Sequence, residues 1–277
     1  MNQTTATKPA AAPVSLMTAT KPDLVANFNR QAEAVSSINA SVTMTLTAGS
    51  AYTGVIKQYH QVSAFILAQK PSDIRVIGQV PVVGTNIFDM QSDGTTFHIF
   101  IPSESKFVVG PANLERPSSK PIENLRPQHL VAALFWQPIP PNVPVLFEEA
   151  TDVSPQSYVL TVVRPPENAG DTGASASDWG IARKIWFDRT NLKVSRIEIY
   201  DSAGKIEADD QYGSWAGGAD EYPRQILINR PENDYRLQIG IVKLTLNQEI
   251  SADHFVLQQP AGTQLVQVGQ ESSEARP

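Results

Sequence analysis

The stretch that most constrains the fold is residues 86–109, where two runs of alternating apolar residues flank Asp93-Gly94. Asp-Gly between such runs predicts a hairpin with a two-residue type I′ turn, because both central positions of that turn need a positive φ. This register places apolar side chains of both strands on one sheet face and mixed polar side chains on the other. The predicted pairs are Met90 with Phe97, Phe88 with Ile99, Gln91 with Thr96, and Asp89 with His98.

Alternation with a period of two continues along most of the chain, in short runs separated by Gly, Pro, Asn and Asp. Such runs predict half-buried strands. Because turns join them and no βαβ pattern occurs, we expect a mainly β (α+β) fold with one large curved antiparallel sheet whose consecutive strands are neighbours. Besides the central hairpin, the expected strands are residues 39–48, 52–70, 74–80, 106–109, 145–150, 157–164, 182–188, 192–201, 205–212, 223–230 and 235–247.

Two details of strand pairing can be predicted in the second half of the chain. The apolar parity switches between Val194 and Ile197, which indicates a β-bulge. The four-residue loop at 231–234 sets Ile228 opposite Leu237, so that this hairpin also has one apolar face.

Two segments with helical spacing accompany the strands. Pro22-Asp23 can open a helix, because a proline at an early helical position loses no hydrogen bond. A second, compact helix is expected at 128–136, where Pro138 and the prolines after it end it. We expect both helices to cover the concave apolar face of the sheet. The apolar stripe of the first helix consists of Leu24, Phe28, Ala32, Val35 and Ile38.

Composition excludes several classes of function. A net charge of −6 argues against nucleic-acid binding, which relies on clustered Lys and Arg. The chain has no cysteine, and its four histidines are widely spaced, so we expect neither a thiol nucleophile nor a metal site. No G-x-S-x-G, H-E-x-x-H or phosphate-binding glycine motif occurs. We therefore predict a protein that is not an enzyme and has no catalytic residues and no cofactor.

Three acidic groups are candidates for paired carboxylates or cation ligands. Each lies in or beside a turn, or on the expected outer face of a strand, so a solvated surface position is the ordinary interpretation. The groups are Glu148-Glu149, Glu207 with Asp209-Asp210, and Asp220-Glu221.

The chain divides into one domain and two tails. Residues 1–21 are rich in Ala, Thr, Pro and Lys and read as a disordered tether, residues 22–268 as a single domain, and residues 269–277 as a polar tail. The tether lacks the apolar core of a signal peptide and a lipid-anchor cysteine. Whether a leader with such a cysteine precedes this sequence is left open.

A curved sheet that is apolar inside, with helices laid into it, either closes as a core or leaves a cavity for an apolar ligand. Both interpretations remain open for each inward-facing residue. A short apolar tip between Pro81 and Gly84, Val82-Val83, either inserts into a membrane or touches a partner, or packs as a buried loop. The candidate cavity residues are Phe28, Met44, Leu46, Ile66, Val76, Phe88, Met90, Phe97, Ile99, Leu134, Phe135, Ile197 and Ile199.

Several motifs resemble those of the LolA/LolB-like family of periplasmic lipoprotein carriers and outer-membrane lipoprotein receptors. They are a strand ending in Lys70-Pro71, an arginine in the next strand at Arg75, the Ser92-Asp93-Gly94 hairpin, and a strand closing on Pro102. Residues 186–191 and 196–204 are similar to the second half of that family. The resemblance implies an unclosed half-barrel whose helices form a lid over bound acyl chains. The chain departs from the family pattern in Lys70, where the family often has Arg, and in a longer loop at 165–180.

The resemblance and the residues together predict non-enzymatic binding of lipid or lipoprotein acyl chains in a hydrophobic half-barrel cavity. The expected process is lipoprotein sorting or transport in the bacterial envelope, by a periplasmic monomer that a lipidated N-terminus could tether to the outer membrane. The alternative is an envelope-stress sensor or protein-interaction adaptor built on the same fold. Expected partners are acyl chains, and also a membrane surface or another envelope protein.

Overall fold

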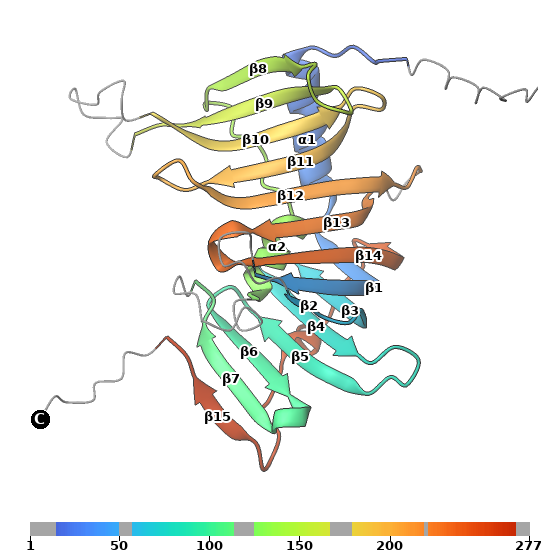
Figure 1. Cartoon of the computed structure of the whole chain (residues 1–277), viewed down its shortest axis with the longest axis vertical. Helices are drawn as coiled ribbons and strands as arrows, with labels where there is room; N and C mark the ends of the chain where they lie inside the picture. Colours follow the sequence, from blue (N-terminus) through green and yellow to red (C-terminus); the bar gives the residue numbers. More distant parts are fainter. Residues whose placement is uncertain (1–14, 50–56, 114–124, 167–178, 219–220, 270–277) are drawn as a thin grey trace, which may run out of the picture.

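A computed structural model describes residues 15–49, 57–113, 125–166, 179–218 and 221–269 of the chain. Within these ranges, fifteen strands form one sheet, accompanied by two α-helices (Figure 1). The sheet is not closed into a barrel: β8 and β15 lie at its two ends. The predicted fold class, an open antiparallel sheet forming a half-barrel with helices on its apolar face, is confirmed. Most of the predicted tether, long loop and polar tail lies outside the described residues.

The helices are α1 (Lys21–Ala34) and α2 (Pro127–Leu134). The strands of the first half are β1 (Ser37–Ala48), β2 (Lys57–Gln58), β3 (Val62–Gln69), β4 (Asp73–Gln79), β5 (Asn86–Ser92), β6 (Thr96–Ile101) and β7 (Lys106–Pro111). Those of the second half are β8 (Val145–Ala150), β9 (Ser157–Arg164), β10 (Gly180–Asp188), β11 (Lys193–Tyr200), β12 (Ile206–Trp215), β13 (Pro223–Arg230), β14 (Tyr235–Leu246) and β15 (Gln264–Gln267).

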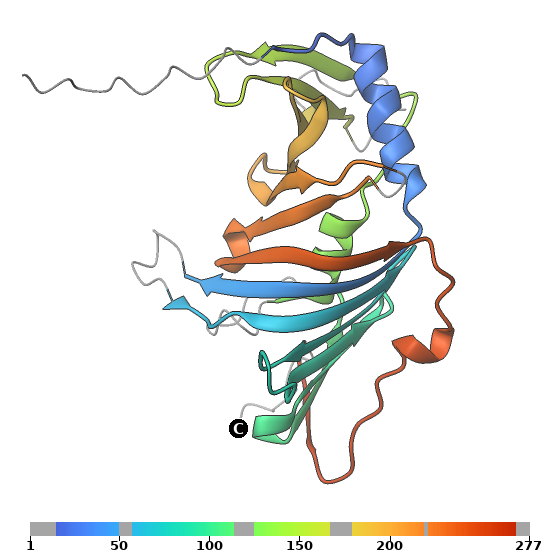
Figure 2. The same ribbon diagram turned by 90° about the vertical axis from the view of Figure 1, so that its right-hand side faces the viewer.

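The strand order corrects the prediction that consecutive strands are always neighbours. β1 lies in the middle of the sheet, between β3 and β14, and joins the two halves. β7 and β8, consecutive in the sequence, lie far apart, because the segment that connects them crosses the concave face as α2. β15 was not predicted, and it pairs in parallel with β7. Figure 2 shows the curvature of the sheet and the long C-terminal segment that leads to β15.

The central hairpin forms, but with a different register from the predicted one. Ser92 pairs with Phe97 and Met90 with Ile99, so the loop has four residues rather than two. The Asp93 carboxylate explains the longer loop, because its Oδ1 accepts hydrogen bonds of 2.8 Å from the backbone N–H groups of both Thr95 and Thr96. The register moves by two residues, which preserves the period of the strand and therefore keeps the predicted faces.

Both predicted helices form, and both end earlier than expected. A capping box between Thr20 and Asp23 starts α1, which stops at Ala34 because Val35 is already extended. Ile38, predicted on the helical stripe, is instead a fully buried residue of β1. α2 ends at Leu134, two residues before the predicted end. Neither helix among the described residues is long and apolar enough to cross a membrane.

Other pairings agree with the sequence more closely. The bulge between β10 and β11 is present, with Phe187 opposite Val194 and Trp186 opposite Arg196. Ile228 lies opposite Leu237 as predicted. The expected strand at 52–70 is represented by β2 and β3, which are separate strands, and residues 50–56 lie outside the described part.

The core fills the concave side of the sheet beneath the two helices. α2 packs against β4, β5 and β13, and α1 lies over the second half of the sheet (Figure 1). The side chain of Asn27 on α1 donates to the carbonyl of Leu192, which follows β10. Phe28, on the buried face of α1, stacks on Trp136 with ring centroids 5.6 Å apart. This stack joins α1 to the segment that leaves α2.

Candidate functional site

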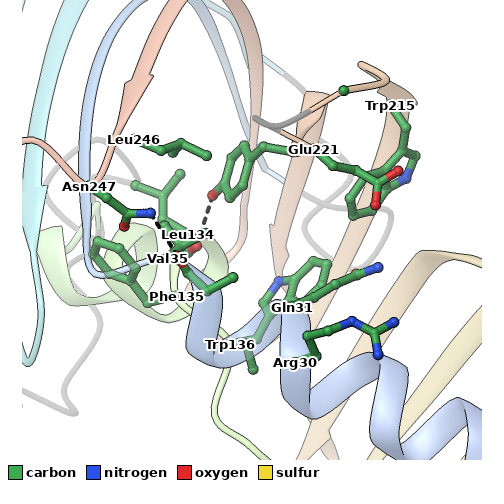
Figure 3. A pocket seen from close by; sticks show the side chains of 14 residues that line it. Arg30, Gln31, Val35, Leu134, Phe135, Trp136, Trp215, Glu221, Leu246 and Asn247 are labelled. Atoms are coloured by element: carbon green, nitrogen blue, oxygen red, sulfur yellow. Dashed lines mark hydrogen bonds between the residues drawn. The ribbon is translucent and has the colours of Figure 1, made fainter.

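A pocket of about 260 Å³ lies where the C-terminal ends of α1 and α2 meet the rim of the sheet (Figure 3). α1 supplies one wall, the end of α2 the floor, and the ends of β12 and β14 the opposite side. The lining residues are Arg30, Gln31, Ala32, Ala34, Val35, Leu134, Phe135, Trp136, Trp215, Gly218, Glu221, Tyr222, Leu246 and Asn247.

Tyrosine hydroxyls hold the floor of the pocket in place. The last carbonyls of a helix lack partners within the helix and need donors from elsewhere. Tyr222 donates to the Leu134 carbonyl at 2.8 Å, and Tyr212 donates to the Ala133 carbonyl at 3.1 Å. Both tyrosines are buried, and burial raises their pKa values above the usual range. They therefore remain neutral donors, and the end of α2 is fixed against β12 and the segment before β13.

Two polar side chains hold the C-terminal end of α1 in the same way. Lys70 Nζ donates to the Ala32 carbonyl at 2.6 Å, and its charge lies 5.8 Å from the centre of the Phe135 ring. Asn247 Nδ2 donates to the Ala34 carbonyl at 2.8 Å. Burial lowers the pKa of Lys70, yet the ammonium keeps a charge-assisted hydrogen bond. These two contacts connect the α1 wall of the pocket to the sheet.

Aromatic rings give the pocket its apolar character. Trp136 lies at the centre of the group: it stacks on Phe28 and meets the rings of Tyr212 and Trp215 edge-on, with centroids 5.0 and 5.9 Å away. Such edge-on contacts are favourable for aromatic pairs. Phe135 and Tyr222 also line the pocket, so an apolar ligand would meet aromatic rings there beside a comparable share of polar surface.

The mouth of the pocket is polar. Glu221 forms an ion pair with Lys193, and Arg30 donates to Asn27 Oδ1 at 2.8 Å. The Oε1 atom of Gln31 is buried and has no hydrogen-bond partner among the described residues. The lining therefore combines aromatic rings with polar groups, which in a small-molecule site fix the orientation of the ligand.

A partly buried cation supports the aromatic wall from behind. Arg183 on β10 donates to the carbonyls of Gln137 and Pro138 at 2.6 and 3.0 Å, and its guanidinium lies 5.3 Å from the centre of the Phe28 ring. Burial lowers the pKa of Arg183 to about 10, so it remains charged at neutral pH. It therefore fixes the segment after α2 to the sheet by charge-assisted hydrogen bonds.

A second polar network lies beneath the middle of α2. Arg230 makes two hydrogen bonds to Asp210, of 2.5 and 3.2 Å, and donates to the His129 carbonyl at 3.1 Å. The His129 ring lies 2.6 Å from the Tyr235 hydroxyl, measured from Nδ1. Burial, with the positive charges of Arg230 and Arg126, lowers the pKa of His129 to about 3. Burial raises the pKa of Asp210, and the Arg230 charge opposes that rise.

This network corrects the sequence interpretation of the acidic groups. Asp210 is fully buried rather than solvated, and Asp209 is buried on the other face of β12, where Arg196 binds it at 2.6 Å. The prediction of an exposed position is confirmed for Glu148, Glu149 and Glu207, while Asp220 lies outside the described residues. No group of three or more potential metal ligands occurs in the described part of the chain.

The structure distributes the predicted cavity residues unevenly. Leu134 and Phe135 line the pocket, and Phe28 lies directly behind it against Trp136. Phe97 is buried beneath the guanidinium of Arg126, 5.3 Å from its ring centre. Six others are buried in the core, namely Met44, Leu46, Ile66, Val76, Met90 and Ile197. Phe88, Ile99 and Ile199 are partly buried at the edge of the same core.

Of the two interpretations of the Val82-Val83 tip, burial is wrong. The two side chains are 107% and 74% exposed. Val83 N–H donates to the Pro81 carbonyl at 2.8 Å across Val82, whose φ is 70°. A positive φ is rare for a β-branched residue and strained. The turn therefore holds two valines at the apex of the β4–β5 hairpin, away from the core.

Most of the pocket was not predicted from the sequence. Arg30 and Gln31 lie beside the predicted helical stripe, so the helical period alone could have placed them at its border. Leu246 and Asn247 reach the pocket only because β14 pairs with β1, a contact between distant parts of the chain that no local pattern encodes.

Comparisons with known proteins support the fold. No known family profile matches the sequence, and no curated protein matches it. Among solved structures, a DUF1329 family protein of Desulfovibrio piger is 14% identical with a TM-score of 0.50, over 84% of this chain and 95% of that one. A LolA superfamily protein of Nitrosomonas europaea is 12% identical with a TM-score of 0.48, over 84% and 97%. The likeness to the Desulfovibrio piger structure concerns the fold alone, and it carries no function over to this chain.

Proposed function

We propose that this protein binds an acyl chain of a lipid or lipoprotein, without catalysing a reaction, in the pocket between α1, α2 and the sheet rim. The observation that carries the proposal is the aromatic pocket around Trp136, with its polar mouth at Arg30 and Glu221. The motifs shared with the LolA/LolB-like family support the same function. Its place would be the periplasm of a bacterial envelope, in lipoprotein sorting or transport, as a monomer.

The size of the pocket sets what it can hold. If a methylene group occupies about as much space as a water molecule, roughly 30 Å³, then 260 Å³ accommodates about eight carbon atoms. Burial of about eight methylenes contributes about 6 kcal/mol before ordering costs. A longer chain needs more room. Movement of the α1 end, which Lys70 and Asn247 hold, would extend the pocket toward the predicted residues of the neighbouring core.

Mass spectrometry of the native protein after mild extraction tests this proposal. We expect a bound lipid or acylated species, and uptake of a fluorescent fatty acid by the delipidated chain. Ala34 is exposed and lines the pocket, so Ala34→Phe should reduce uptake. Ala26→Phe, the same change at an exposed position of α1 outside the pocket, is the matched control. A protein that never carries lipid and takes up no fatty acid would refute the proposal.

The exposed tip at Val82-Val83 supports a second element of the proposal, contact with a membrane surface or with another envelope protein. Apolar side chains held at the apex of a hairpin lose nothing by leaving water and gain by insertion into an apolar phase. Replacement of both valines by Asp should abolish flotation with phospholipid vesicles. Val256→Asp, at an exposed valine elsewhere, is the control. Equal flotation of the two variants and the parent chain would contradict the membrane role.

A further inference from the structure

The edge of β8 is an unpaired strand edge at one end of the sheet (Figure 1). β8 has six residues and pairs with β9, and no other strand among the described residues covers its second edge. Natural sheets usually protect such an edge by a short strand, charged side chains (above all lysine), a proline or a bulge. β15 at the opposite end is short, with four residues. β8 is longer, and it contains neither lysine nor proline.

The hydrogen-bond pattern shows which groups point outward. Val163 N–H donates to the Pro144 carbonyl at 3.0 Å, which makes this a hydrogen-bonded position of the β8–β9 pair. Because bonding positions alternate along an antiparallel strand, Val145, Phe147 and Glu149 direct their backbone groups away from β9. Lys21 Nζ, which donates to the Val145 carbonyl at 3.3 Å, occupies the first of these outward positions. The backbone groups of Phe147 and Glu149 remain for an incoming strand.

The sequence of β8 is Val-Leu-Phe-Glu-Glu-Ala, so apolar residues precede two adjacent acidic ones. Leu146 is 63% exposed and Phe147 38%. Glu148 and Glu149 are also exposed; Glu149 pairs with Arg189 at 3.1 Å, whereas Glu148 has no ion pair within the described ranges. Leu146 and Glu148 share one face of the sheet, since they are two residues apart.

This order disfavours a second copy of the chain as the occupant. In an antiparallel pair of β8 strands related by a two-fold axis, a carboxylate faces either an apolar side chain or another carboxylate. A pair centred on Phe147 sets Leu146 opposite Glu148, and a pair centred on Glu148 sets the two carboxylates opposite each other. Neither arrangement gives opposite charges, and like charges directly opposite are destabilising.

We propose that the β8 edge binds an extended peptide segment of another protein, which adds to the sheet as an antiparallel strand. Its residue opposite Glu148 is basic and its residue opposite Leu146 is apolar, so the peptide reads basic–any–apolar from N- to C-terminus. Leu146 and Glu148 occupy the positions that are not hydrogen-bonded to the new strand, where side chains across a pair approach more closely. Main-chain hydrogen bonds provide affinity and these two side chains provide specificity.

Binding of a blocked ten-residue peptide with Lys-Phe-Val at its centre to the full chain tests this proposal. Hydrogen exchange of the backbone amides serves as a second readout. We expect saturable binding and new protection of the Phe147 and Glu149 amides. Glu148→Lys should weaken binding roughly fivefold, since an attractive cross-strand pair becomes repulsive. A peptide with Glu in place of Lys should recover binding to that variant. Glu207→Lys, the same change at an exposed residue of β12, should leave binding unchanged.

Several results would overturn the proposal. One is equally tight binding of the reversed peptide, Val-Phe-Lys, because that order requires a parallel strand. Others are protection of amides elsewhere than in β8, or no saturable binding at millimolar peptide. Dimerisation of the chain that protects the same amides without peptide would assign the edge to a second copy. Binding only after removal of residues 1–14 would assign it to the chain's own N-terminal segment.

Discussion

Acidification should destabilise this protein through His129, the largely buried histidine of α2. Its pKa is about 3 in the fold and 6.5 for an exposed imidazole. Between these values the unfolded chain binds a proton that the folded chain does not, so the free energy of unfolding decreases as the pH falls below 6.5. The stability that the neutral His129 side chain contributes is fully present above pH 6.5 and is lost as the pH falls toward 3.

The size of the effect follows from the two pKa values. At pH 5 the pH lies about 1.5 units below the pKa of an exposed imidazole. This gap corresponds to a loss of about 2 kcal/mol of stability, at about 1.36 kcal/mol per unit. His129→Gln removes the titrating group but keeps a side chain that can reach the Tyr235 hydroxyl. We expect this variant to be less stable at pH 7 by about 1 kcal/mol, owing to imperfect packing and hydrogen bonding. Its stability should, however, depend less on pH than that of the parent chain.

Urea denaturation at pH 7 and pH 5 measures this dependence. The parent chain should lose about 2 kcal/mol more than His129→Gln between the two pH values. His60→Gln, at a histidine that is exposed in the fold, should behave like the parent chain. If His129→Gln and the parent chain lose the same stability on acidification, His129 is not the buried neutral group described above.

Three further substitutions test other parts of the structure. Asp210→Asn should cost about 3–5 kcal/mol of stability, because it leaves Arg230 buried without its carboxylate. Asp210→Leu combined with Arg230→Met should restore most of that stability. A loss below about 1 kcal/mol for Asp210→Asn in denaturant unfolding would contradict this reasoning. Gly94→Ala should lower stability by about 1–3 kcal/mol. Its φ is +90°, and the new Cβ would lie 2.5 Å from the side-chain oxygen of Ser72. Gly84→Ala, with positive φ but open space around it, should cost less, about 1 kcal/mol in the same thermal or urea assay, and equal costs would refute the steric argument. Lys70→Met should lower stability by about 1–2 kcal/mol, since it removes the donor to the Ala32 carbonyl in the last turn of α1. Amide hydrogen exchange in that turn should become faster. Unchanged exchange there would show that this contact does not hold the helix.

The sequence predicted features that depend on neighbouring residues. The loop at 231–234 fixes the register of β13 and β14, and the change of parity after Val194 marks the bulge in β11, because both are set within a few residues. The hairpin at Asp93 was predicted in kind but not in length. Its Asp side chain bonds two backbone N–H groups and stabilises a longer loop, which a rule based on the Asp-Gly pair does not include.

Features that depend on distant pairing could not be predicted. The position of β1 between β3 and β14 places Asn247 beside the end of α1, and only this contact brings the β14 rim to the pocket. Burial of Asp210 has the same origin, because Arg230 on the next strand and His129 on α2 surround it. In the sequence, Asp210 is one of several acidic residues in a strand of mixed polarity. Of the predicted cavity residues, Leu134 and Phe135 line the candidate pocket, and the rest of its lining comes from these distant contacts.

The most direct test of acyl-chain binding uses the tryptophans of the pocket as reporters. Trp136 and Trp215 line it, so Trp179→Phe with Trp186→Phe leaves fluorescence from the pocket alone. Titration of this double variant with a brominated fatty acid should give saturable quenching. Ala34→Phe in the same background should weaken apparent affinity by roughly tenfold, the equivalent of about 1.4 kcal/mol, whereas Ala26→Phe should not. Absence of saturable quenching, or equal quenching of both variants, would contradict an acyl-binding pocket at this position.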